Sequence, residues 1–423
     1  MASFSFGAGN AKKLRAIPLY AAGWVLTRLV PRTRDEWVFG CAVGIADGAL
    51  AVWEQARAGE VPAVWLVDGP EQERDAAARG IPTLRKGSVR ALWRTARARV
   101  VVITHGFGDV DRYAVSGAFI VQLWHGIPLK RIGIDSPETV RSALLPSSRF
   151  VRTVLAAMYR SATRRIGLLP AASHLVRGRL ESAFSLPDER VPVVGEPRVD
   201  VLSRGSAGER RRTARATLER VTGPIGDRAV VLYAPTWRDG DPDPAIPDAE
   251  DWAAISGLLQ ERDAILLIRS HPLGAGDYRP PAGEDRIRML GSDRVADVTP
   301  LLPGLDVLIT DYSSLAFDAS LVPLPEIFLA PDVAEYARRR GFYGSFHDVA
   351  GDDPARTWPQ ALGQLDAVLT DPAERERRLA RARDLDARVH AYRDGRNAER
   401  VYRAIIAAIG ADRHPERSGK DTE

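Results

Sequence analysis

The chain has 423 residues, 45% hydrophobic and 27% charged, which is the balance of an ordinary globular protein with about two or three domains. Its one cysteine, Cys41, excludes an internal disulfide framework and a CxxC zinc site, and suits a reducing compartment. The net charge is only +4, but residues 12–34 carry six basic and no acidic side chains, and residues 129–166 carry eight against two. This local excess indicates an anionic partner: a phosphate polymer, a nucleic acid or a membrane surface.

The first predicted element is the apolar stretch AIPLYAAGWVL at 16–26, which follows three cations. It resembles the core of a signal peptide, but no small-residue cleavage site follows, and eleven residues are too few to span a bilayer. We expect an interfacial helix that either lies against a membrane face or packs on its own domain. No other segment is long and apolar enough to be expected to span.

From residue 36 onward, short apolar runs alternate with helical patterns such as the one near 47–58. Continuous apolar runs bounded by glycine and proline are typical of strands buried on both faces, and their alternation with helices predicts parallel sheets. The runs are 37–43, 61–67, 99–106, 119–126, 165–173 and 191–195, then 229–237, 264–272, 286–290, 305–310 and 325–331.

This rhythm is interrupted once, by an arginine-rich interval, and the predicted domains follow from that interruption. We expect two doubly wound α/β domains facing across a cleft, with ligands bound beyond the carboxyl ends of the strands. A charged helix or helix pair is predicted over 370–409. The predicted segments are an N-terminal basic helix (1–35), a first domain (36–205), an interdomain segment (206–228), a second domain with C-terminal helices (229–410) and a disordered tail (411–423).

Polar clusters follow several of these strands, at the edge where ligands bind. After the strand 305–310 the chain reads DYSS, where the serines are either ordinary helix caps or donors to a phosphate at the helix start. After the strand at 264, Arg269 and His271 share one face of an extended chain, which suits a diphosphate, although surface residues are the plainer interpretation. APTWRDG at 234–240 and GEPRVD at 195–200 complete the set.

The order and spacing of WHGIPLK, GEPRVD, APTWRDG, RSHP and ITDYSS resemble the CDP-glycerol glycerophosphotransferase family, the teichoic-acid primases and polymerases. The segment 330–343 is also similar to that family's approach to an RGFY motif, and the resemblance covers roughly residues 36–365. It implies a GT-B fold, in which two Rossmann-like domains are present and the second holds most of the nucleotide. The family usually has threonine at Ile127, tyrosine at Glu196 and asparagine at Val199, so the identity of the transferred polyol stays open.

The resemblance also implies site residues. His125 matches the histidine of the WHG motif and His271 the family's second essential histidine, so both are predicted to be catalytic. The predicted substrate-binding residues are Gly126, Lys130, Arg198, Thr236, Arg238, Arg269, Asp311, Ser313 and Ser314.

The implied reaction is attack by an acceptor hydroxyl on the β-phosphate of a CDP-polyol, with release of CMP. A neutral imidazole suits the removal of the hydroxyl proton, and we assign this role to His125, although the roles of the two histidines can be exchanged. The donor is CDP-glycerol or a similar CDP-polyol, and no cofactor is expected. Because no acidic cluster has metal-ligand spacing, metal is predicted to be dispensable. The sequence leaves the oligomeric state open.

The implied reaction suggests a role for the basic segment 129–166. Residues 151–166 place five apolar side chains at helical spacing with arginines available for other faces, which is typical of a helix on a membrane surface or of one packed on its own domain. Family members act on lipid-linked acceptors, so the resemblance implies a cytoplasmic protein, peripheral on the inner face of the cell membrane, that acts in the synthesis of a teichoic-acid-like cell-wall or capsule polymer.

Three alternatives share some of these features. A nucleotide-sugar-dependent GT-B glycosyltransferase would have the same fold and diphosphate site. A CDP-ribitol ribitolphosphotransferase would differ only in its polyol pocket. A non-enzymatic basic module that binds nucleic acid or a phosphate polymer would explain the arginines but not the histidines at strand ends, so we expect no nucleic-acid partner.

Overall fold

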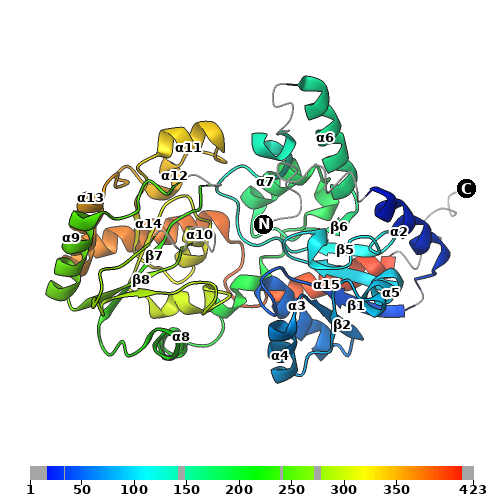
Figure 1. Ribbon diagram of the computed structural model, residues 1–423, viewed down its shortest axis with the longest axis horizontal. Helices are drawn as coiled ribbons and strands as arrows, with labels where there is room; N and C mark the ends of the chain where they lie inside the picture. The colour runs from blue at the N-terminus through cyan, green and yellow to red at the C-terminus, as the bar shows by residue number, and fades with distance from the viewer. Residues whose placement is uncertain (1–16, 33, 142–147, 239–241, 271–277, 412–423) are drawn as a thin grey trace, which may run out of the picture. The chain divides into compact units, whose positions relative to one another are not determined.

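The computed structural model of the protein describes residues 17–32, 34–141, 148–238, 242–270 and 278–411 (Figure 1). The chain forms two compact units. Unit 1 contains the residues up to His125, Ile132–Asp200 and the residues from Arg396 on, and unit 2 contains Gly126–Arg131 and Val201–Gly395. These boundaries differ from the predicted domains, because residues 206–228 are part of unit 2 and residues 396–410 return to unit 1. The predicted disordered tail lies outside the described residues from 412 on.

Unit 1 is built on a six-stranded parallel sheet in the order β3-β2-β1-β4-β5-β6, the strand order of Rossmann folds. Its strands are β1 (Arg34–Phe39), β2 (Ala63–Val67), β3 (Thr83–Arg85), β4 (Ala98–Ile103), β5 (Phe119–Gln122) and β6 (Ile166–Leu168). The short β3 was not predicted. The predicted strand at 191–195 is wrong: Val193 makes a single bridge to Ala171, and Pro192 has no N–H to donate to a ladder.

Helices surround this sheet, and an aromatic core lies beneath them. They are α2 (Ile17–Leu29), α3 (Asp47–Ala58), α4 (Pro70–Ala78), α5 (Val89–Arg97), α6 (Arg149–Thr163), α7 (His174–Phe184) and α15 (Asn397–Ala411). Phe39, Trp53 and Trp65 pack ring on ring in the core, with centroids 5.0–5.9 Å apart. Helix α15 packs on α3 and adds Val401 and Ile405 to the same core.

Helix α15 is tied to unit 1 by a buried cap. The two carboxylate oxygens of Asp200 accept hydrogen bonds of 2.8 Å from the backbone amides of Asn397 and Ala398, at the start of the helix. The Asn397 side chain donates to the carbonyl of Glu196. Gly195, with φ +83°, leaves room for Asn397, because a Cβ there would lie 2.0 Å from the asparagine oxygen. The GEPRVD segment therefore positions the last helix.

Unit 2 repeats the architecture with a five-stranded parallel sheet in the order β11-β10-β7-β8-β9. Its strands are β7 (Ala229–Ala234), β8 (Ala264–Ile268), β9 (Ile287–Met289), β10 (Val307–Thr310) and β11 (Glu326–Phe328). Its helices are α8 (Ala207–Thr222), α9 (Ala249–Glu261), α10 (Leu315–Ser320), α11 (Val333–Arg339), α12 (His347–Ala350), α13 (Trp358–Thr370) and α14 (Pro372–Val389). The predicted C-terminal helix pair is α14 and α15, and they belong to different units.

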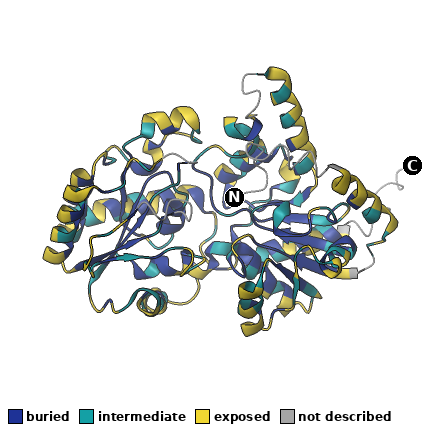
Figure 2. Ribbon diagram, in the orientation of Figure 1, coloured by how far each residue is buried: buried dark blue, intermediate teal, exposed yellow. Residues whose placement is uncertain are grey.

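The central strands of both units are buried, as their apolar sequences predict, whereas the short edge strands β3 and β9 are partly exposed (Figure 2). All five residues of β8 are buried, for example. Helix α2 both packs and protrudes: Tyr20 stacks edge-on against Tyr113 with centroids 4.8 Å apart, whereas Leu29 is 77% exposed. Within the described residues, no helix combines the length and hydropathy needed to cross a membrane.

Candidate active site

The backbone bends sharply where β5 ends, and this bend presents His125. Leu123 still donates to the carbonyl of Ile103, at 2.8 Å, as the sheet pairing continues past Gln122. Trp124 then adopts φ 63°, a left-handed conformation that is rare for a bulky residue, and Gly126 follows at φ 130°. Such a backbone conformation costs about 1–3 kcal/mol and persists where the surroundings enforce it, typically at functional sites.

The imidazole of His125 lies against two rings. The indole of Trp124 has its centroid 4.2 Å away at an angle of 36°, and His105 stacks nearly parallel, at 4.4 Å and 6°. Trp124 is itself held edge-on by Phe184, with centroids 5.1 Å apart. The predicted catalytic histidine therefore has a defined position within unit 1.

His105 is a second imidazole at this site, and the sequence interpretation did not single it out. It follows β4 in ITHG, just as His125 follows β5 in LWHG, and the two strands are adjacent with Ile103 opposite Gln122. The signal was therefore present as two His-Gly pairs at the ends of consecutive strands. Parallel strands end at the same sheet edge, which brings the two rings together.

The backbone around His105 is fixed by one carboxylate. Oδ2 of Asp109 accepts hydrogen bonds from the amides of Thr104, His105 and Gly106, at 2.9, 2.7 and 3.3 Å. Burial, together with the positive charge of Arg198, lowers the pKa of His105 to about 4, so this imidazole is neutral at pH 7. His105 is thus a rigid and uncharged neighbour of His125.

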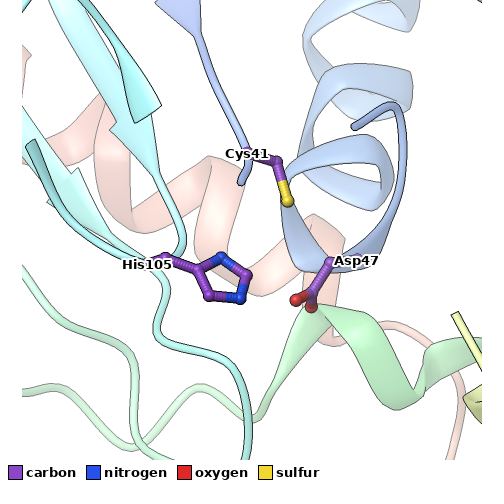
Figure 3. A group of neighbouring side chains, drawn as sticks. All are labelled: Cys41, Asp47 and His105. Atoms are coloured by element: carbon purple, nitrogen blue, oxygen red, sulfur yellow. The ribbon is translucent and has the colours of Figure 1, made fainter. Parts of the chain in front are cut away.

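Cys41 and Asp47 converge on His105 (Figure 3), with donor atoms that all lie within 4.8 Å of one another. Such a set could in principle hold a metal ion. However, the Thr104 hydroxyl already contacts Cys41 Sγ at 3.1 Å and His105 Nδ1 at 2.7 Å. Burial and the Asp47 carboxylate raise the pKa of the Cys41 thiol, which opposes the thiolate form that binds metals. We therefore interpret the group as hydrogen-bonded polar residues.

The structure brings Arg198, a predicted substrate-binding residue, to this same group. Arg198 lies in a 3₁₀ turn at Pro197–Leu202, and its Nε is 3.5 Å from Oδ1 of Asp47. Both side chains are largely buried, so the cation is balanced locally. Within unit 1, the candidate group therefore consists of His125, His105, Asp47 and Arg198.

Unit 2 holds a candidate group of its own, centred on the buried guanidinium of Arg238. It forms an ion pair with Asp311, at 2.8 Å, and a bidentate pair with Asp332, at 2.8 and 3.1 Å. The rings of Tyr312 and Tyr336 lie against it, with centroids 4.9 and 5.2 Å from the guanidinium carbon. Arg238 was predicted to bind substrate, but the structure shows it engaged with two carboxylates, which makes it an organiser of this region.

Lys130 adds a cation beside this centre. It lies in the segment 126–131, which joins unit 2 through a bridge from Lys130 to Phe342 and a 3.0 Å bond from the Arg131 amide to the Gly341 carbonyl. Burial, with help from the nearby charges of Arg340 and Arg238 and against the opposing charge of Asp311, lowers the pKa of Lys130 to about 8. An ammonium group held among other cations is a natural binding site for an anion.

Asp311 also organises the strand ends around it. Its Oδ1 accepts hydrogen bonds from the amides of Thr236, at 2.9 Å, and Tyr312, at 2.6 Å. Among the described residues, nothing bonds the buried hydroxyl of Thr236. Lys130, Thr236, Arg238 and Asp311 were predicted from three separate motifs, and the structure places them together.

Of the other predicted residues of unit 2, Ser313 and Arg269 make structural hydrogen bonds. Ser313 Oγ accepts the Leu315 amide at 3.2 Å, the capping interpretation of the DYSS segment, whereas the Ser314 side chain caps nothing in the six-residue α10. The guanidinium of Arg269 donates to the carbonyls of Leu290, Val295 and Ala296 and so fixes that loop. His271 lies outside the described residues.

Comparison with known proteins gives concordant results. The profile of the family described as CDP-glycerol:poly(glycerophosphate) glycerophosphotransferase matches residues 28–407. A teichoic acid poly(glycerol phosphate) polymerase of Staphylococcus epidermidis is 31% identical over 253 residues, 58% of this chain and 33% of that protein. A teichoic acid glycerol-phosphate transferase of Staphylococcus aureus is 28% identical over 271 residues, 62% of this chain and 65% of that protein. The chain therefore spans a third of one relative and just under two thirds of the other.

The fold is also that of a solved structure. The wall teichoic acid polymerase TagF superimposes with a TM-score of 0.73 at 21% identity, covering 95% of this chain and 96% of the compared chain. This likeness, together with the two doubly wound parallel sheets, confirms the predicted GT-B fold.

Proposed function

Because the chain belongs to the CDP-glycerol:poly(glycerophosphate) glycerophosphotransferase family, we propose that it transfers glycerol phosphate, or a related polyol phosphate, from a CDP-polyol to a hydroxyl of a lipid-linked acceptor. CMP is the leaving group, and the product belongs to a teichoic-acid-like polymer of the cell wall or capsule. The description of the family supports the donor, and the names of the two staphylococcal relatives support the polymer. The proposal requires neither a cofactor nor a metal ion.

The observation that carries the proposal is the position of His125. An acceptor hydroxyl attacks the β-phosphorus of the donor, a new P–O bond forms, and the bond from that phosphorus to the oxygen of CMP breaks. The hydroxyl proton passes to the imidazole of His125, which acts as general base. The rings of Trp124 and His105 fix the orientation of the base before the substrate arrives, and pre-organisation of this kind lowers the barrier.

Unit 2 supplies the groups suited to the diphosphate. Lys130 contributes an ammonium group and Thr236 a hydroxyl that no described residue bonds, while Arg238 and Asp311 hold the strand ends in place. Positive charge near a diphosphate stabilises the negative charge that builds up on the leaving CMP. In this proposal Arg269 and Ser313 support the site through the loop and the turn that they bond.

A membrane surface is the proposed location of the acceptor. On α6, Val151 and Leu155 are partly covered and Tyr159 is buried, whereas Phe150, Val154 and Met158 are 77%, 41% and 48% exposed (Figure 2). The last three are spaced by four residues, so they form one outward apolar row. Exposed Arg149, Arg152 and Arg160 on the same helix favour anionic lipid headgroups.

Vesicle flotation tests the membrane part of the proposal. Replacing Phe150, Val154 and Met158 together by serine should abolish flotation with anionic vesicles and leave the melting temperature unchanged. The matched control replaces Val89 and Trp93, which are 83% and 46% exposed on α5, by serine and should float normally. Equal flotation of the α6 variant and the wild type would exclude this helix as the contact.

A donor panel tests the reaction. Incubation with CDP-glycerol, CDP-ribitol and UDP-sugars, with detection of CMP or UDP, separates the proposed activity from ribitol-phosphate transfer and from sugar transfer. Ile127, Glu196 and Val199, which differ from the family pattern, leave the ribitol alternative open. His125→Ala should abolish CMP release and keep donor binding, whereas the control His174→Ala, at an exposed position on α7, should be fully active. Turnover by the His125 variant would reject its role as base.

A further inference from the structure

We propose that His105 is a positioning residue for His125: its ring stacks on the imidazole of the general base and holds that imidazole in one orientation. The inference rests on the proposed function, because it assigns His105 a role in the same reaction. Its basis is the near-parallel stack, with ring centroids 4.4 Å apart and an angle of 6° between the planes.

Both the backbone and the ring of His105 are held by hydrogen bonds. The three bonds from Asp109 fix the backbone of His105, and the Thr104 hydroxyl contacts Nδ1 and so fixes the rotation of the ring. The backbone next to His125, by contrast, is bent through the left-handed conformation of Trp124 and through Gly126. A histidine in such a turn needs outside contacts to keep one orientation, and His105 provides a flat one.

The charge of His105 is matched to the reaction. When His125 takes the acceptor proton it becomes a cation, and a cation is attracted to the face of an uncharged aromatic ring. Two imidazolium rings at the same separation would repel each other. The groups that face His105 are Cys41 from the end of β1, Asp47 from α3, Asp109, Arg198 and His125 itself, and burial dominates over them in keeping His105 neutral.

This arrangement predicts different effects for three substitutions. His105→Ala removes the stacked ring. Since a misplacement of about 1 Å can cost roughly 100-fold in rate, kcat should fall roughly 10- to 100-fold, and the KM for the donor should stay within about 2-fold of wild type. His105→Phe restores a flat ring and should recover most of kcat. His105→Asn keeps a polar group for Thr104 but no ring, and should be as slow as His105→Ala. Cys41→Ala, the control from the same group, should remain close to wild type.

A second measurement does not depend on turnover. The imidazole proton signals of His125, assigned by their loss in His125→Ala, should shift in His105→Ala because the ring current of the stack is lost, and the pKa of His125 should change with them. His105→Phe should keep a stacked signal. These signals separate alignment of His125 from a general loss of structure, for which the melting temperature is the check.

The outcomes are distinct. If the wild type releases no CMP from any CDP-polyol, the proposed function fails, while the NMR comparison still decides whether His105 aligns His125. If His105→Ala shows wild-type kcat and unchanged His125 signals, the inference is overturned. Should His105→Ala fail to fold, His105→Asn decides: wild-type kcat and unchanged His125 signals in that variant would equally overturn the inference.

Discussion

Lys130 gives a sharp pH prediction, because its pKa is about 8 rather than that of a free lysine. A bound diphosphate favours the charged ammonium of Lys130, so CDP-glycerol binds chiefly to the fraction of the free protein in which Lys130 is protonated. From the pKa, that fraction is about 0.9 at pH 7 and about 0.1 at pH 9. The dissociation constant of CDP-glycerol should therefore rise about tenfold between pH 7 and pH 9, and the diphosphate itself does not titrate in this range.

Calorimetric titration of CDP-glycerol at pH 7, 8 and 9 measures this dependence. Lys130→Arg keeps a positive charge at all three values and should bind with nearly constant affinity, whereas Lys130→Met should bind roughly tenfold more weakly at pH 7 and show no dependence. Glu326 also titrates near pH 8 in unit 2 and is unchanged in both variants, so it serves as an internal control. A tenfold dependence that persists in Lys130→Met, or constant affinity in the wild type, would refute the assignment.

Three further predictions concern stability and metal dependence. Burial raises the pKa of Glu326 to about 8, so its contribution to stability is complete below about pH 4.5 and is lost as the pH rises through 8. Glu326→Gln should therefore raise the melting temperature at pH 8.5 and leave it unchanged at pH 4.5, and an equal shift at both values would contradict this linkage. Asp200→Ala leaves two buried amides of α15 without acceptors and should cost about 2–4 kcal/mol in urea unfolding, with Asp200→Asn intermediate; a loss under about 0.5 kcal/mol would show that the cap is unimportant. Dialysis against EDTA should leave CMP release within about twofold of the untreated protein, and activity restored only by added Zn²⁺ or Mg²⁺ would show that metal is required.

The apolar pattern of the sequence predicted most of the strands and the strand ends that carry polar residues, although it missed the short β3 and placed a strand wrongly at 191–195. Runs such as AILLI at 264–268 are buried on both faces, and local hydropathy records that burial directly. The positions of His125, Thr236 and Asp311 just beyond such runs followed from the same pattern, as did the doubly wound class. Each of these features depends on residues that are close along the chain.

Only the tertiary structure decided which strand ends and helices become neighbours. The sequence of a single strand does not specify its neighbours in a parallel sheet. The stack of His105 on His125 therefore depends on β4 lying beside β5. Likewise the carboxylates that engage Arg238 come from residues 311 and 332, and the cap of α15 comes from Asp200, 197 positions before Asn397. Contacts across such separations depend on the packing of the whole unit, which the local pattern of the sequence does not specify.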